Sequence, residues 1–425
     1  MEAWRATAPT PALDLFGGGS PPRLLFQPLE PMKKFFIAAA AVCSLAAFAQ
    51  TPQPPEIAAK AYLLLDVTAK QVLAAKAADE SVEPASLTKL MTAYLVFDAL
   101  RARKIDLQQT LPVSERAWKM PGSRMFIDPK MQVSVEDLLK GMIVQSGNDA
   151  TVALAEGVGG SVERFVEMMN AQAQALGMKS TSYRNPEGLT VAGHRTTARD
   201  LSLLATRLMQ DFPEYISLYA IKHYRYPGTP AANDNNRNLL LFRDPTVDGL
   251  KTGHTEAAGY CMVATAHREF PNLVVAGAKP GSAAAMGSRR LLSIVLGADS
   301  EVSRAVESQK LLNWGYTAFD AVKLFEANQA IVTPAVWKGT QSTVRVGDVQ
   351  AVVIAVAGGS ANTIKTQVLR TDPLLAPLAS GQNVATLRVF QGDQAVRDIP
   401  LQALESVPQA GLLSRTWDAL RLWIR

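Results

Sequence analysis

Residues 84–100 read PASLTKLMTAYLVFDAL. This run has no helix breaker after Pro84 and is apolar on most faces, which predicts a buried helix. Ser86 falls in the first turn, where serine is a favoured cap. Lys89 follows three residues later, and no other serine in the chain has a lysine at that spacing. Residues three apart share a helix face, so the hydroxyl and the ammonium group should be neighbours.

This spacing suggests nucleophilic catalysis. A serine hydroxyl becomes a good nucleophile only when a base takes its proton. An ordinary lysine is protonated at neutral pH, but burial in an apolar helix near other cations lowers its pKa and makes a neutral amine available. The alternative is a capping serine beside a surface lysine. The spacing alone leaves both interpretations open.

Two further tripeptides could complete such a site. Ser146-Gly147-Asn148 breaks the helical pattern of residues 133–156. Ser146 could relay a proton to a leaving amine and Asn148 could hold a substrate amide, although a turn is the default role of such a tripeptide. A second Ser-x-Asn, at 360–362, reads better as a loop.

Lys251-Thr252-Gly253 is the only Lys-Thr/Ser-Gly in the chain and lies in a strand-like segment. A cation and a hydroxyl on a strand can bind a carboxylate. Glycine lets a substrate backbone lie close to that strand.

The order Ser-x-x-Lys, Ser-x-Asn, Lys-Thr-Gly is typical of penicillin-binding proteins and class A β-lactamases. More narrowly, the chain resembles low-molecular-mass penicillin-binding proteins, the D-alanyl-D-alanine carboxypeptidases. The resemblance lies in PASLTKLMTAYL (84–95), VEDLLKGMIVQSGNDA (135–150), TARDL (197–201) and DGLKTGHTEAAGY (248–260). It extends over nearly everything after Met32.

The resemblance implies that Ser86 attacks the carbonyl of a terminal D-Ala-D-Ala bond of a peptidoglycan stem peptide and forms an acyl-enzyme that water hydrolyses. Lys89 would be the base, and Ser146 would help to protonate the departing D-alanine. β-Lactam antibiotics would be covalent inhibitors.

The resemblance also assigns the binding residues. Backbone N–H groups of Ser86 and His254 would form the oxyanion hole. The terminal carboxylate would be bound by Lys251, Thr252 and Arg237, although the spacing from Arg237 to Lys251 departs slightly from the family's pattern. Asn148 and Gly253 would contact the substrate as described above.

Periodicity divides the chain into regions. An opening hairpin from Ala59, helices over 161–175 and 197–210, and antiparallel strands over 247–279 predict an α+β catalytic domain at 56–318. Short β-prone segments then predict an all-β domain at 319–405.

Residues 411–425 form a separate helix. Its apolar side would carry Leu412, Leu413, Trp417, Leu420, Trp423 and Ile424. Tryptophan with arginine on an amphipathic helix predicts an anchor on the inner-membrane surface. The alternative is a helix packed on the protein's own surface.

The beginning of the chain predicts export. Residues 32–49 combine two lysines, an apolar run and the cleavage pattern Ala47-Phe48-Ala49, as a secretory signal does. We interpret residues 1–31 as an over-long gene prediction. A lipoprotein reading would use Cys43, but Val42 before it is bulkier than that processing usually accepts. The expected location is the periplasmic face of the cytoplasmic membrane, with peripheral attachment.

Composition argues against other classes. The 43 Lys and Arg residues only slightly exceed the 38 Asp and Glu residues, and they are spread along the chain, so we expect no nucleic-acid partner. Two cysteines, Cys43 and Cys261, and four histidines without metal-ligand spacing predict no disulfide, metal or cofactor.

Three other functions are alternatives to the carboxypeptidase. A class A β-lactamase would need an acid to activate the deacylating water, and the only candidate, Glu187 in Asn185-Pro186-Glu187-Gly188, has surroundings that fit a turn better. A D,D-endopeptidase usually lacks the β domain. A non-catalytic wall-binding protein would not need every motif residue intact.

Overall fold

The computed structural model describes residues 52–270, 274–275 and 287–424. The predictions for residues 1–31 and 32–49, including Cys43, lie outside the described residues.

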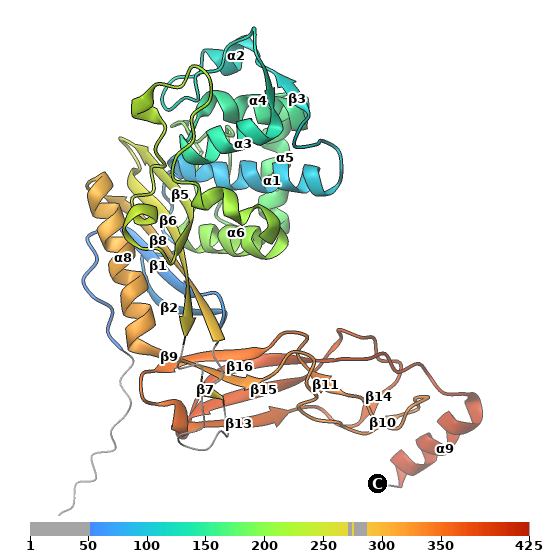
Figure 1. Ribbon diagram of the computed structural model, residues 1–425. Helices are drawn as coiled ribbons and strands as arrows, with labels where there is room; N and C mark the ends of the chain where they lie inside the picture. Colours follow the sequence, from blue (N-terminus) through green and yellow to red (C-terminus); the bar gives the residue numbers. More distant parts are fainter. Residues whose placement is uncertain (1–51, 271–273, 276–286, 425) are drawn as a thin grey trace, which may run out of the picture. The chain divides into compact units, whose positions relative to one another are not determined.

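A five-stranded antiparallel sheet forms the centre of the catalytic part, with the order β2-β1-β8-β6-β5 (Figure 1). Its strands are β1 (Ala61–Asp66), β2 (Gln71–Lys76), β5 (Val247–Thr255), β6 (Gly259–Phe270) and β8 (Gly287–Ala298). The hairpin predicted from Ala59 is β1 and β2. Strand β8 was not predicted, because it is buried on both faces and its sequence therefore lacks the alternation that marks a half-buried strand.

Helices cover both faces of this sheet. Side chains alternate across a strand, so Leu63 joins the apolar core on one face and Leu64 joins the core on the other. Helix α8 (Glu301–Ala318) packs on β6 and β8, while α6 (Ala198–Asp211) packs on β1 and β8 from the opposite face (Figure 1). Helix α8 was missed because several of its buried residues are polar, which weakens the apolar period.

The remaining helices of the catalytic part surround α1 (Lys89–Arg101), which is buried along nearly its whole length, as predicted. They are α3 (Val135–Val144), α4 (Asn148–Gly159) and α5 (Val162–Ala175). The predicted break at Ser146 separates α3 from α4. Short elements complete this part: β3 (Thr110–Pro112), α2 (Glu115–Trp118), β4 (Gln132–Ser134), the 3-10 turns Pro213–Ala220 and Ala231–Asn233, and α7 (Leu240–Arg243).

The position of Ser86 corrects one prediction. Ser86 does not cap a helix but lies inside the 3-10 turn Ala85–Thr88 that leads into α1. Neither this turn nor α1 has a side-chain cap hydrogen bond at its start. Instead, the Ser86 hydroxyl forms a hydrogen bond with Lys89 Nζ.

The C-terminal part is all-β up to its last helix. Its apolar core is built from β-strand residues such as Val322, Ile354, Leu387 and Leu401. One sheet has the order β11-β16-β15-β13, a second β12-β9-β7 and a third β10-β14. The strands after residue 318 are β9 (Phe319–Phe325), β10 (Val336–Trp337), β11 (Val346–Gly347), β12 (Val352–Ala357), β13 (Ile364–Leu369), β14 (Leu374–Leu375), β15 (Asn383–Gln391) and β16 (Gln394–Ala403), with a 3-10 turn at Ala361–Thr363. Strand β7 (Val274–Val275) belongs to the segment 247–279 predicted to form antiparallel strands of the catalytic domain, but it pairs in parallel with β9, so the prediction is wrong for these two residues.

Helix α9 (Leu412–Trp423) ends the described chain. No helix within residues 52–270 and 287–424 has the length and apolar character needed to cross a bilayer.

Candidate active site

A cavity of about 460 Å³ opens where the start of α1, the α3–α4 break and strand β5 meet. The predicted residues that line it are Ser86, Ser146, Asn148, Arg237, Thr252, Gly253 and His254. Lys89 and Lys251 are buried and do not line the cavity, but each hydrogen-bonds a serine that does. Folding therefore brings all nine predicted site residues together from four separate stretches of the chain.

Lys89 lies at the centre of the first cluster. Its Nζ lies 2.9 Å from Ser86 Oγ, 2.7 Å from Asn148 Oδ1 and 2.7 Å from the carbonyl oxygen of Glu187. Burial lowers the pKa of Lys89 to about 7, and the negative charges of Glu187 and Asp149 act in the opposite direction. A neutral amine is therefore well populated near neutral pH, and its lone pair can accept the hydroxyl proton of Ser86.

Lys251 forms a second lysine–serine pair. Its Nζ donates hydrogen bonds to Ser146 Oγ at 3.0 Å and to the carbonyl oxygen of Thr252 at 3.0 Å. Burial holds the pKa of Lys251 well below its ordinary value, and the positive charges of Lys89, Arg304 and Arg237 lower it further. Ser146 has a positive φ of 61°, a strained conformation for a residue with a side chain.

Two residues at the start of α4 fix one wall of the cavity. Asn148 donates from Nδ2 to the carbonyl oxygen of Pro121 at 2.7 Å while its Oδ1 accepts from Lys89. The buried carboxylate of Asp149 accepts hydrogen bonds from the backbone N–H groups of Met125 and Phe126, both at 2.8 Å. These contacts hold the segment that contributes Gly122 and Ser123 to the lining.

Strand β5 approaches the nucleophile closely. A Cβ added to Gly253 would lie 3.1 Å from the backbone nitrogen of Ser86, which explains why glycine suits this position. The preceding Ala85 has a positive φ of 47°. The backbone N–H groups of Ser86 and His254 are the two groups predicted for an oxyanion hole. The His254 ring is exposed and lies against Tyr260, with ring centroids 4.0 Å apart.

Three charged residues of the lining, Glu187, Glu301 and Arg304, were not among the predicted site residues. Arg304, on the unpredicted helix α8, donates to the carbonyl oxygen of Gly253 at 3.2 Å and to Glu301 at 2.9 Å. Glu187 had been set aside as part of a turn. The turn exists, because Asn185 Oδ1 accepts from the Gly188 N–H at 2.7 Å, but it places Glu187 in the cavity wall.

Comparisons with known proteins agree with this geometry. Residues 48–279 match the family model described as D-alanyl-D-alanine carboxypeptidase, peptidase family S11. Residues 319–409 match the C-terminal domain of penicillin-binding protein 5. The chain belongs to the D-alanyl-D-alanine carboxypeptidase family.

Individual relatives of this carboxypeptidase extend over most of its length. D-alanyl-D-alanine carboxypeptidase DacC of Escherichia coli K12 is 38% identical over 87% of this chain and 89% of its own. Penicillin-binding protein 5 of Haemophilus influenzae has a TM-score of 0.74 and 35% identity, over 84% of this chain and 100% of that chain. Penicillin-binding protein D2 of Listeria monocytogenes, solved in the ampicillin-bound form, has a TM-score of 0.53 and 30% identity, over 63% of this chain and 100% of that chain.

The family, the penicillin-binding-type catalytic domain and the all-β C-terminal domain predicted from sequence are thereby confirmed. The chain is a D-Ala-D-Ala carboxypeptidase, a hydrolase.

Proposed function

We propose that this carboxypeptidase removes the terminal D-alanine of peptidoglycan stem peptides through an acyl-enzyme on Ser86. The observation that carries the proposal is the 2.9 Å contact between Lys89 Nζ and Ser86 Oγ at the wall of the cavity. A nucleophile within hydrogen-bond reach of a base of matched pKa is the arrangement that acyl transfer needs.

In the first half of the reaction, neutral Lys89 takes the hydroxyl proton as Ser86 Oγ attacks the scissile carbonyl. The developing oxyanion is bound by the backbone N–H groups of Ser86 and His254, and each such donor stabilises a transition state by about 3 kcal/mol. The C–N bond then breaks, and the proton that Lys89 accepted passes through Ser146 to the departing D-alanine, which leaves Lys89 neutral. Lys251 keeps the Ser146 hydroxyl in place through its 3.0 Å hydrogen bond.

The substrate carboxylate is bound at the side of the cavity formed by β5. Arg237 and Thr252 line it there, and Arg304 adds a third polar group. A guanidinium offers paired donors that match a carboxylate. Lys251 is directed to Ser146 and does not line the cavity, so it supports this region through its hydrogen bond to Ser146.

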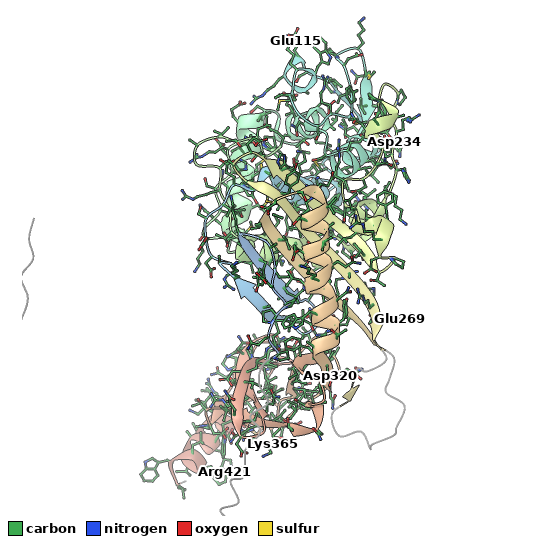
Figure 2. All side chains as sticks on the ribbon, turned by 90° about the vertical axis from the view of Figure 1, so that its left-hand side faces the viewer. Glu115, Asp234, Glu269, Asp320, Lys365 and Arg421 are labelled. Carbon is green, nitrogen blue, oxygen red and sulfur yellow. The ribbon has the colours of Figure 1, made fainter. Side chains whose placement is uncertain are left out.

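Membrane attachment belongs to the same proposal. The polar side of α9 contacts the β domain: Asp418 accepts from the Lys338 N–H at 2.7 Å, and the Arg421 guanidinium lies over the Trp337 ring at 5.8 Å. Figure 2 shows side chains of α9, around the labelled Arg421, projecting away from the ribbon of the β domain.

The apolar side of α9 is exposed. The residues concerned are Leu412, Leu413, Trp417, Leu420, Trp423 and Ile424. A helix packed on the protein's own surface would cover these residues, whereas an interfacial helix presents them to lipid. We therefore infer peripheral attachment to the periplasmic face of the inner membrane after export, with no part for nucleic acid.

The test combines product and adduct. Purified protein is incubated with an N-acylated peptide ending in D-Ala-D-Ala, and free D-alanine is measured; a second sample is treated with benzylpenicillin and the adduct is located by mass spectrometry. We expect D-alanine release and one adduct, on Ser86, and neither with Ser86→Ala. Absence of both in the wild-type protein, or an adduct elsewhere, would overturn the proposal. Release from cross-linked dimers or rapid penicillin hydrolysis would favour the endopeptidase or the β-lactamase.

A further inference from the structure

Glu187 is a buried acid that the acylation step does not use. Its side chain is 5% exposed, and the residue lines the same cavity as Ser86. A carboxyl group is rarely buried without a specific partner. The cation that most strongly lowers the pKa of its carboxyl is Lys89, the proposed base.

The turn that carries Glu187 is fixed against the nucleophile. The carbonyl oxygens of Pro186 and Glu187 accept hydrogen bonds from Thr92 Oγ1 and Lys89 Nζ, each at 2.7 Å, so two residues of α1 hold the turn. A side chain on the next residue, Gly188, would overlap the Ala85 carbonyl oxygen and lie 3.0 Å from the Ser86 nitrogen. Glu187 is therefore placed rigidly beside the Ser86 turn.

We propose that Glu187 is the general base for the second half of the reaction, in which water hydrolyses the acyl-Ser86 ester. This inference rests on the proposed function, because it requires an acyl-enzyme on Ser86. The sequence offered Glu187 as the candidate for this role but favoured a place in a turn.

The step balances without any added reactant. A water in the cavity gives a proton to the Glu187 carboxylate as its oxygen forms a bond to the ester carbonyl carbon. The tetrahedral intermediate collapses with cleavage of the bond between that carbon and Ser86 Oγ. Neutral Lys89 accepts the proton from Glu187 and passes it to Oγ, which lies 2.9 Å from its Nζ, so that Glu187 is again a carboxylate and Lys89 again a neutral amine. The products are the shortened peptide acid and free Ser86.

The electrostatic surroundings suit this role. Burial raises the pKa of the Glu187 carboxyl above its ordinary value, while the positive charges of Lys89 and Arg116 act against burial. A carboxylate with a raised pKa is a stronger base than a solvated one. Lys89 in turn interacts with the negative charges of Glu187 and Asp149, while Lys251, whose pKa burial also lowers, and the buried Arg304 guanidinium are further basic groups of the site.

Glu187→Gln separates this proposal from its rival, in which Lys89 is the base in both halves. Removing the Glu187 charge lowers the pKa of Lys89 further, since that charge raises it. If Lys89 alone served both steps, hydrolysis by Glu187→Gln would be as fast as in the wild type at pH 7 and faster at lower pH. If Glu187 is the base, hydrolysis slows by about 100-fold or more.

The experiment follows deacylation directly. Wild-type enzyme, Glu187→Gln and Glu187→Asp are acylated with benzylpenicillin, freed of excess drug, and followed by intact mass from pH 5 to pH 9. The acylated fraction is also measured during turnover of a D-Ala-D-Ala peptide. Only folded, acylated protein enters the first measurement, so loss of folded protein does not affect the lifetime.

For Glu187→Gln, we expect a long-lived penicillin adduct and accumulation of peptidyl-enzyme during turnover of the peptide. The decrease in its deacylation rate at acid pH should also disappear. Glu187→Asp should recover part of the wild-type deacylation rate. Glu83→Gln is the matched control, because Glu83 accepts from Thr190 beyond the same turn but does not line the cavity. Deacylation by Glu187→Gln within about twofold of the wild type, or loss of acylation itself, would overturn the inference. Absence of any Ser86 adduct in the wild type would instead overturn the proposed function.

Discussion

The Nζ of Lys251 lies 3.0 Å from Ser146 Oγ, and Lys251 is 3% exposed. This relationship gives the site two lysine–serine pairs, since Lys89 and Ser86 are related in the same way. The first pair would activate the nucleophile. The second would govern the proton that the leaving amine needs.

If Lys251 acts through Ser146, the two residues should behave as one unit. We expect Lys251→Met and Ser146→Ala each to lower kcat for D-alanine release by about 100-fold, and the double variant to be no worse than either single variant. Arg237→Ala is the comparison, because loss of a carboxylate contact should mainly raise KM, by roughly tenfold or more. If the double variant instead loses the product of the two single effects on kcat, and Lys251→Met raises KM, Lys251 binds the substrate carboxylate directly.

Acylation should depend on pH through Lys89. Its pKa is lowered to about 7 by burial, and the neutral amine is the active form. The rate constant for acylation by benzylpenicillin should therefore rise about tenfold per pH unit below pH 7 and level off above it. Enzyme held at low pH and returned to pH 7 should regain full activity, which separates titration from unfolding. A profile that is flat from pH 5.5 to 9 would contradict this assignment.

Gly188 should not tolerate a side chain. It has a φ of 93°, and an added Cβ would overlap the Ala85 carbonyl oxygen beside the nucleophile. Gly177→Ala is a matched control, because Gly177 has a φ of 80° but no atom within 4 Å of an added Cβ.

In urea titrations, the free energy of unfolding should fall by about 1 kcal/mol for Gly177→Ala and by about 1–3 kcal/mol more for Gly188→Ala. Acylation by penicillin should be slowed only by the second. Equal effects of the two changes would show that the Gly188 turn is not held tightly against Ala85.

Helix α9 should bind lipid through its tryptophans. Trp417 is 61% exposed and Trp423 is 84% exposed. Replacing both by serine should lower partitioning onto anionic vesicles on the order of 100-fold, because each buried side chain contributes at least about 1.5 kcal/mol. Deleting residues 411–425 should release the protein completely from membrane fractions.

The control for α9 is Trp118→Ser. Trp118 is also exposed, at 41%, but lies on α2 of the catalytic part. Its replacement should leave partitioning unchanged. Binding that survives deletion of residues 411–425 would exclude α9 as the attachment element.

Local sequence patterns were enough to predict the candidate site residues and the class of fold. The three motifs are local: a spacing of three residues places Lys89 beside Ser86, and a break between two helices carries Ser146. Such features can be predicted because side chains repeat every 3.6 residues in a helix and every 2 residues in a strand, and both periods are visible in short segments of sequence. The order of the motifs and the β-rich region after residue 319 were enough to predict the family.

The pairing of those residues depends on packing between distant parts of the chain. Lys251 is 105 residues from Ser146 in the chain, and Glu187 is 98 from Lys89. Strand β8 lacks a clear local period because it is buried on both faces, and helix α8 lacks one because its buried face includes polar residues, so Arg304 could not be placed. Glu187 looked like a turn residue because its neighbours do form a turn. Its burial and its proximity to Lys89 arise from long-range packing of that turn on α1, which no local pattern encodes.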